Sequence, residues 1–238
     1  MERIRQSIAR SMEVCDAMYP FEKHRIISNQ DYARLWGKLL YQKVFEDESR
    51  SEELKRQLDF MLEHLHRSGL PDDDSEGTYR YLGDLGSLEP AEYYGLIISP
   101  LVLAYEMFGD EKYLEHAGKV CRHVARSSWT DRSGARRLHR AWLKIGGRWH
   151  KINEPMLIAG MGMTLYGVHR FLEHRRDEEL ANFLRECDET YALYQNPRGY
   201  FASATGWQNE ADVAPCAAWH SHDWFYLLHR YGAGPELV

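Results

Sequence analysis

Two short signals recur along the chain at nearly equal spacing, and they constrain the fold more than any other feature. The first is an acidic turn between two helical segments. It centres on Asp47, Asp110 and Asp177. An acidic residue is favoured at a helix N-cap and in the first turn, because the helix dipole is positive there. Each of these turns therefore predicts the start of a new helix.

The second signal is a proline that ends a long irregular stretch and opens an apolar segment. It occurs at Glu89-Pro90, Glu154-Pro155 and Ala214-Pro215. Proline at the first helical position loses no hydrogen bond and already has a helical φ. The two signals interleave, which predicts a repeating unit of helix, short acidic turn, helix and long loop.

The spacing of the two signals predicts one all-α domain over residues 1–238, built from about eight helices. We expect an inner, more apolar set at 29–45, 90–107, 155–173 and 215–231. We expect an outer, amphipathic set at 50–68, 111–127 and 177–195. A first helix at 2–18 has no partner in sequence and is free to pair with the last helix and close the array. Gly160, Gly162 and Gly167 would let inner helices approach closely.

The long loops carry the little β structure that we expect. Residues 136–155 alternate in polarity around Gly146-Gly147, which predicts a small β-hairpin with a tight turn. Pro100, inside an apolar segment, indicates either a kink or a restart capped by Ser99. All long loops fall at one end of the array, over the N-termini of the inner helices.

The segment 101–117 resembles a known group of proteins. An apolar helix ending Leu103-Ala104-Tyr105 and a turn reading FGDEKYL at 108–114 are similar to the α/α-toroid enzymes. That group includes six-hairpin glycosidases, polysaccharide lyases and sugar epimerases. The resemblance implies an α/α-barrel with a substrate cleft at its loop end, lined by aromatics, carboxylates and histidines. Four hairpins are fewer than the usual ring, so we expect either a smaller closed barrel or an open arc.

A polar and aromatic cluster, WHSHDW at 219–224, opens the last inner helix at the loop end. His220 and Asp223 are three residues apart and share a helical face, and Trp219 lies on its edge. We expect His220 and Glu154 to transfer protons, with Glu89 and Asp223 as supporting carboxylates. The alternative is that Glu89 and Glu154 only cap their own helices. Asp31, in the first turn of the first inner helix, has the same two interpretations.

Several loop residues are candidates for binding the substrate. Trp142, Trp207 and Trp219 offer stacking surfaces. His139 and His150 flank the hairpin turn and could form a lip with Trp142, or could only cover the barrel rim. Tyr81, Arg80 and His222 complete the candidate set, although a solvated turn would contain the same residue types. His123 and the remaining histidines fall on outer or lower helix parts and are interpreted as surface or satisfied core residues.

No cofactor and no metal are expected. Cys216 and His220 have a spacing that two zinc ligands can use, but no CxxC or HxxxH accompanies them. The net charge of −6 argues against a nucleic-acid partner, and no apolar run reaches the length of a membrane span. Four separated cysteines and the lack of an apolar N-terminal segment predict a cytoplasmic protein. A homo-oligomer is compatible with the sequence.

The sequence therefore favours an enzyme that acts on a sugar or similar polyhydroxylated molecule by acid–base chemistry, as a hydrolase, lyase or epimerase. Two alternatives stay open. One is a biosynthetic cyclase or isomerase with an aromatic-lined pocket for an apolar substrate. The other is a non-catalytic helical-repeat protein whose loop face binds a partner.

Overall fold

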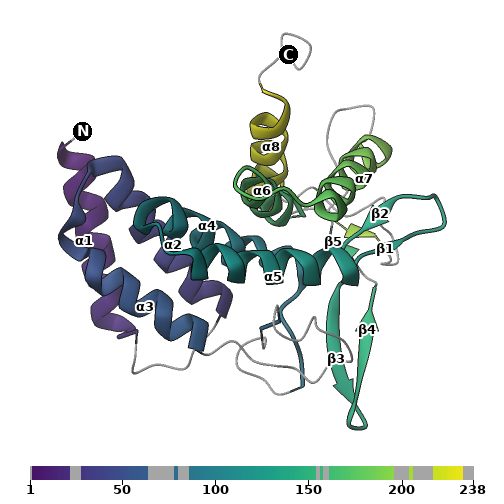
Figure 1. Ribbon diagram of the computed structural model, residues 1–238, viewed down its shortest axis with the longest axis horizontal. Coiled ribbons are helices and arrows are strands. Elements are labelled where there is room, and N and C mark those ends of the chain that lie inside the picture. Colours follow the sequence, from purple (N-terminus) through teal and green to yellow (C-terminus); the bar gives the residue numbers. More distant parts are fainter. Residues whose placement is uncertain are drawn as a thin grey trace.

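The computed structural model describes residues 2–21, 28–63, 78–79, 86–153, 156–157, 161–195, 204–205 and 217–232. These ranges contain eight α-helices, shown in Figure 1. The helices are α1 (Glu2–Met18), α2 (Ser28–Phe45), α3 (Ser51–Glu63), α4 (Gly95–Phe108), α5 (Glu111–Ser127), α6 (Met161–Leu172), α7 (Glu178–Tyr194) and α8 (Ala217–Tyr231). Short 3-10 turns, Glu48–Arg50 and Ala91–Tyr93, precede α3 and α4. The predicted all-α fold of about eight helices is confirmed.

The helices form two layers in the predicted order. The inner helices α2, α4, α6 and α8 pack in sequence order, each against the next. The outer helices α3, α5 and α7 pack on α2, α4 and α6. Asp47, Asp110 and Asp177 each accept a hydrogen bond from a backbone N–H two or three residues later, as N-caps do. The acidic turns thus start helices as the sequence predicts.

The predicted start of the third inner helix differs from the structure. We expected the third inner helix to open at Pro155, but α6 begins only at Met161. Met156–Leu157 instead forms strand β5, which pairs with β6 (Ala204–Thr205). Backbone pairing between two loops therefore overrides the local signal for a helix. Pro100 lies inside α4, which runs as one helix through it.

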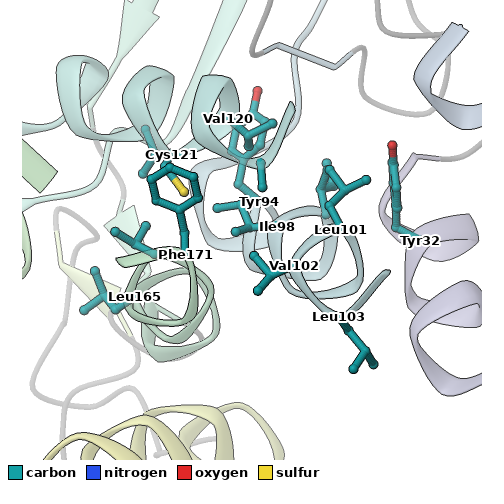
Figure 2. Packing of buried hydrophobic residues seen from close by; sticks show 14 of the residues in the cluster. Tyr32, Tyr94, Ile98, Leu101, Val102, Leu103, Val120, Cys121, Leu165 and Phe171 are labelled. Carbon is teal, nitrogen blue, oxygen red and sulfur yellow. The ribbon is translucent and has the colours of Figure 1, made fainter. Parts of the chain in front are cut away.

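The core lies between α4, α5 and α6. In Figure 2, Phe171 of α6 lies against Cys121 of α5, and Ile98 and Val102 of α4 lie beside them. All four side chains are buried. The hydroxyl groups of Tyr32 and Tyr94 lie on the same side of this core (Figure 2). The apolar core therefore carries these two hydroxyl groups on one of its sides.

Glycines set the spacing of the inner helices. A Cβ on Gly95 of α4 would lie 2.2 Å from the carbonyl oxygen of Met163 in α6. A Cβ on Gly162 of α6 would lie 2.5 Å from Cα of Asp223 in α8. Both contacts are with backbone atoms that cannot move aside. The predicted role of Gly162 in close approach is confirmed, whereas Gly160 lies outside the described residues.

The inner helices also cap one another. Glu89, just before α4, accepts a hydrogen bond from the Asn29 N–H in the first turn of α2. Thr164 Oγ1 of α6 accepts from the Gly95 N–H at the start of α4. Asp223 of α8 accepts from the Gly162 N–H at the start of α6, at 2.8 Å. The starts of α2, α4 and α6 therefore each receive a capping hydrogen bond from a side chain of the next repeat.

The array is an open arc, and one expectation about its closure is wrong. Helix α1 does not pair with α8. It lies against α2 and α3 at the opposite end of the arc from α8 (Figure 1). Asp16 of α1 binds Arg34 and Lys38 of α2 and Arg50 beside α3. This cluster of charges fixes α1 where it is, although none of its residues is buried.

The predicted hairpin is confirmed. Strands β3 (Ala141–Ile145) and β4 (Arg148–Ile152) pair antiparallel around Gly146-Gly147. Both glycines have positive φ, 56° and 79°, as a tight hairpin turn requires. A second short pair joins β1 (Trp129–Thr130) and β2 (Arg136–Arg137). None of the described helices combines the length and the apolar character needed to cross a bilayer.

Candidate functional site

Three polar aromatic side chains meet at the loop end of the core: Tyr94, His123 and His139. Tyr94 directly precedes α4, His123 lies in the last turns of α5, and His139 lies between β2 and β3. The rings of Tyr94 and His123 have centroids 5.3 Å apart, and those of His123 and His139 are 5.6 Å apart. All three side chains have no solvent exposure. We call this set the histidine cluster.

Among the described residues, the two ring nitrogens of His123 and of His139 make no hydrogen bond. The Tyr94 hydroxyl has no partner at hydrogen-bond geometry there either, although the Tyr79 backbone lies close enough to oppose the rise of its pKa. Leaving one such buried group unsatisfied costs about 1–3 kcal/mol. Native structures contain few such groups, and a catalytic or ligand-binding role is one of the reasons for keeping them.

Burial keeps the two imidazoles uncharged. It lowers the pKa of His123 to about 3. It also lowers the pKa of His139 well below its ordinary value, with smaller effects from His123 and Lys151. Each ring is therefore neutral at neutral pH and offers one N–H donor and one acceptor nitrogen. Burial likewise raises the pKa of Tyr94, which stays protonated.

Glu89 lies beside the histidine cluster and is also uncharged at neutral pH. Burial raises the pKa of its carboxyl to about 8, although hydrogen bonds from Asn29 oppose the shift. The Asn29 backbone N–H and its Nδ2 lie 3.2 and 3.1 Å from the two carboxyl oxygens. The negative charge of Glu89, when present, raises the pKa of Tyr94, which places the two groups close together. Glu89 does cap a helix, but the helix is α2 and not its own.

An ion pair borders the cluster. Arg140, next to His139 in sequence, donates to the buried carboxylate of Glu92. The Arg140 side chain is partly exposed. The site thus has an uncharged interior and a paired charge at its edge.

The structure separates the other predicted residues. Asp223 is buried, and its Oδ1 accepts from the Tyr191 hydroxyl at 2.6 Å in addition to the Gly162 N–H. Asp31 is buried beside Arg34. Trp142 is half-buried, and its Nε1 donates to Ser127 Oγ at 3.3 Å. His222 is half-buried on α8. Asp223 therefore acts as a cap at the start of α6. Glu89 is close to Tyr94, and His139 packs on His123, which contacts Tyr94.

The lip predicted from His139 and His150 does not form. His139 is buried in the core, whereas His150 is exposed on β4. His139 lies before β3, outside the paired strands. The alternation of side chains along the hairpin therefore does not place it on the same surface as His150. Arg80, Tyr81, Glu154 and Trp207 lie outside the described residues, and so does Cys216. Trp219 and His220 belong to α8, with side chains beyond what the structure describes.

Two members of the cluster were missed by sequence analysis. His123 was interpreted as a surface or satisfied histidine, and the structure shows that it is buried and unsatisfied. Its neighbours Val120 and Val124 lie three residues before it and one after it on the buried side of α5. These apolar neighbours are the sequence signal that indicates a buried His123. Tyr94 carried no comparable signal, because tyrosines are common in helical cores.

The fold of the chain is similar to that of the α/α-toroid proteins, with helical hairpins in two layers and long loops at one end. No protein-family model matches the chain, and no curated protein matches its sequence.

Solved structures of α/α-toroid enzymes superimpose on it. A cellobiose 2-epimerase from Bacillus thermoamylovorans B4167 matches 86% of this chain and 53% of its own, with a TM-score of 0.63 and 14% identity. A polysaccharide lyase matches 86% of this chain and 55% of its own, with a TM-score of 0.56 and 11% identity. An α-1,6-mannanase of Salegentibacter sp. HEL1_6, in complex with α-1,6-mannotriose, matches 87% and 63%, with a TM-score of 0.55 and 12% identity. The chain thus spans just over half the length of these enzymes, and the likeness is one of fold.

Proposed function

We propose that the protein is an enzyme that acts on a sugar or similar polyhydroxylated small molecule by acid–base chemistry. The observation that carries the proposal is the histidine cluster beside Glu89, buried and without partners at the loop end of the inner helices. Both the cluster and the carboxyl are uncharged at neutral pH, so they favour a neutral ligand rich in donors and acceptors. Sugar hydroxyl groups supply both.

The reaction class needs a general acid and a general base. We assign the acid role to Glu89 and the base role to His220 or Glu154. His139 and His123, whose pKa values burial lowers too far for an effective base at neutral pH, would hydrogen-bond the sugar hydroxyl groups. Hydrolysis, elimination and epimerisation of sugars all use such a pair. The three neighbouring enzymes named above perform one of these reactions each, which supports the proposal at the level of fold.

The remaining candidates belong to the same proposal. His220 and Glu154 stay proton-transfer candidates because their position at the loop end follows from the repeat. Asp223 supports the site by fixing α6 against α8. Trp142, Trp207, Trp219, His150, Tyr81, Arg80, Asp31 and His222 stay candidates for contacts to the ligand, although Asp31 is buried beside Arg34.

The test is a ligand screen followed by an assay for turnover. We would measure the thermal midpoint of the wild-type protein with neutral oligosaccharides, uronic-acid oligosaccharides and apolar isoprenoid mimics, and then search for products chromatographically. The variant is His139→Leu, which removes both ring nitrogens and leaves an apolar side chain of similar volume. The control is Glu52→Gln, a highly exposed side chain in the first turn of α3 and outside the candidate set.

We expect one sugar class to stabilise the wild type and the control but not His139→Leu, and product to form only with the first two. Equal binding and turnover by His139→Leu would contradict the proposal. Stabilisation without any product would favour the non-catalytic binding protein.

One observation favours a second candidate. The cluster and its surroundings are aromatic as well as uncharged: Tyr32 and Tyr79 share a hydrogen bond of 2.9 Å beside it and are both buried. An aromatic, neutral interior also suits a cyclase or isomerase with an apolar substrate. Stabilisation by the isoprenoid mimics alone would select this candidate.

A further inference from the structure

A separate group of side chains lies at the short-turn end of the array, away from the histidine cluster. His169 is in the last turn of α6, Glu173 follows α6 directly, and His229 is in the last turn of α8. His169 and Glu173 are four residues apart and share a helical face. The Glu173 N–H donates to the His169 carbonyl at 3.2 Å, so the helical geometry continues to Glu173. Two packed helices therefore bring two imidazoles and one carboxylate to one place.

The distances are those of a ligand set. Glu173 Oε1 lies 3.7 Å from His169 Nδ1 and 3.5 Å from His229 Nε2. One donor atom from each residue lies within 4.8 Å of the other two. Donors bound to one zinc ion at about 2.0–2.1 Å in tetrahedral geometry are roughly 3.4 Å apart. The observed separations are close to this, whereas the 3.7 Å separation is too long for a good hydrogen bond.

The donor atoms are available and held in place. His169 Nδ1 is buried and makes no hydrogen bond. The His229 ring packs edge-on against Tyr166 and His169, with centroids 4.9 and 5.1 Å away. Glu173 uses its other oxygen, Oε2, to accept from Arg170, which leaves Oε1 facing the imidazoles. A second hydrogen bond of this kind commonly orients a metal-binding carboxylate.

The local charges favour a cation. The negative ends of two helix dipoles, α6 and α8, converge on the group. Two arginines lie nearby, but both are already paired: Arg170 with Glu106 and Glu173, and Arg230 with Asp188.

We propose that His169, Glu173 and His229 bind a first-row divalent transition-metal ion such as Zn²⁺, with an open coordination position. Two imidazoles and one carboxylate suit such ions better than Ca²⁺ or Mg²⁺, which prefer oxygen ligands. His169, Glu173 and Arg230 also line a cavity of about 660 Å³ between α6, α7 and α8. The open position faces this cavity, which would admit a further ligand to the metal.

The experiment is a metal titration of the full chain after removal of metal with a chelator. Binding of Zn²⁺ is measured by calorimetry, and binding of Co²⁺ by its visible absorption, which reports the ligand type. The variants are His229→Gln, which changes a partly exposed ring, and Glu173→Gln. His150→Gln is the control, because it removes an exposed imidazole from the opposite end of the fold. Circular dichroism checks that each variant is folded.

We expect the wild type and the control to bind one equivalent of Zn²⁺ that both variants lose, or bind at least about 100-fold more weakly. The Co²⁺ spectrum should lack thiolate charge-transfer bands. Equal affinity in the wild type and His229→Gln would overturn the proposal. Thiolate bands that persist in His229→Gln would also overturn it, by assigning the metal to a cysteine. Because the measurement uses no substrate, its result is independent of the proposed enzymatic function.

Discussion

At the scale of the residue, the histidine cluster lowers the stability of the fold. His123 and His139 occupy core positions with no partner for any of their four ring nitrogens. An apolar side chain of the same size would avoid the desolvation of those nitrogens. We propose that a bound ligand is the partner that satisfies them.

Replacing His123 separates stability from function. At neutral pH we expect His123→Leu to change the free energy of unfolding by less than about 1 kcal/mol, or to increase it, because no hydrogen bond is lost. We expect turnover to fall by about 10-fold or more, because the bound sugar loses a hydrogen-bond partner worth roughly 1–2 kcal/mol. Chemical denaturation and the product assay measure the two effects. A loss of several kcal/mol with unchanged turnover would show a structural role.

The same variant changes the response to acid. The pKa of His123 is about 3 in the folded state and 6.5 in the unfolded chain, so the unfolded state binds an extra proton between these values. Wild-type stability should therefore fall as the pH drops from 6.5 towards 3, by up to about 1.4 kcal/mol per pH unit from this group. His123→Leu should lack that contribution, which denaturation curves across this range would show.

Glu89 has the opposite dependence on pH. Its pKa rises from 4.5 to about 8 on folding, so the folded state holds the extra proton in this window. Stability from this group is complete below pH 4.5 and is lost as the pH rises to 8. Glu89→Gln, which stays neutral, should remove the slope between pH 5 and 8, measured relative to the wild type. A wild-type slope that persists in the variant would contradict the assignment of the high pKa.

Only part of this site could be predicted from the sequence. Glu89 was found because it occupies a repeat position before a proline, and His139 because it flanks a hairpin turn. Burial shifts the pKa values of both groups, and burial depends on contacts between segments far apart in the chain. The cap that Asp223 makes on α6 is a contact of this kind, because the helical spacing of His220 and Asp223 says nothing about α6.

At the scale of the element, the inner helices depend on side chains from the next repeat. Thr164 Oγ1 accepts from the Gly95 N–H and donates to the Ala91 carbonyl, so one hydroxyl joins the starts of α4 and α6. Asp223 of α8 accepts from the Gly162 N–H at the start of α6 and from the Tyr191 hydroxyl of α7. The acidic turns could be predicted from local chemistry, and they are correct. The start of α6 could not, since the pairing of β5 with β6 involves residues nearly fifty positions apart.

Paired glycine substitutions test this packing. Gly162→Ala places a Cβ within 2.5 Å of backbone atoms of α8, so the helices must separate. We expect a loss of roughly 1–3 kcal/mol in the free energy of unfolding. Gly37→Ala on α2 is the control, because its Cβ meets no atom within 4 Å. It should gain about 0.5–1 kcal/mol from the better helix former. Urea denaturation compares them, and equal effects would show that α6 and α8 are not in close contact.

At the scale of the whole molecule, the repeat predicted the two layers and the position of the loops. The repeat does not predict where α1 packs, and therefore does not predict whether the array closes. Helix α1 has the length to pair with α8, but the ion pairs of Asp16 hold it on α2 and α3. Inside the arc, Trp36 of α2 stacks on Tyr166 of α6, which contacts Phe225 of α8. Aromatic side chains thus occupy the concave side, and the candidate site lies at the loop end.

The central claim is that a sugar supplies the missing partners of His123 and His139. Nitrogen NMR of the imidazole rings tests it most directly, because the chemical shifts report protonation and hydrogen bonding for each nitrogen. We predict two rings that stay neutral from pH 5 to 8 and whose signals move only when the sugar selected by the screen is added. Both sets of signals should be lost in the double variant His123→Leu/His139→Leu. Rings that titrate near 6.5, or that ignore the ligand, would contradict the account.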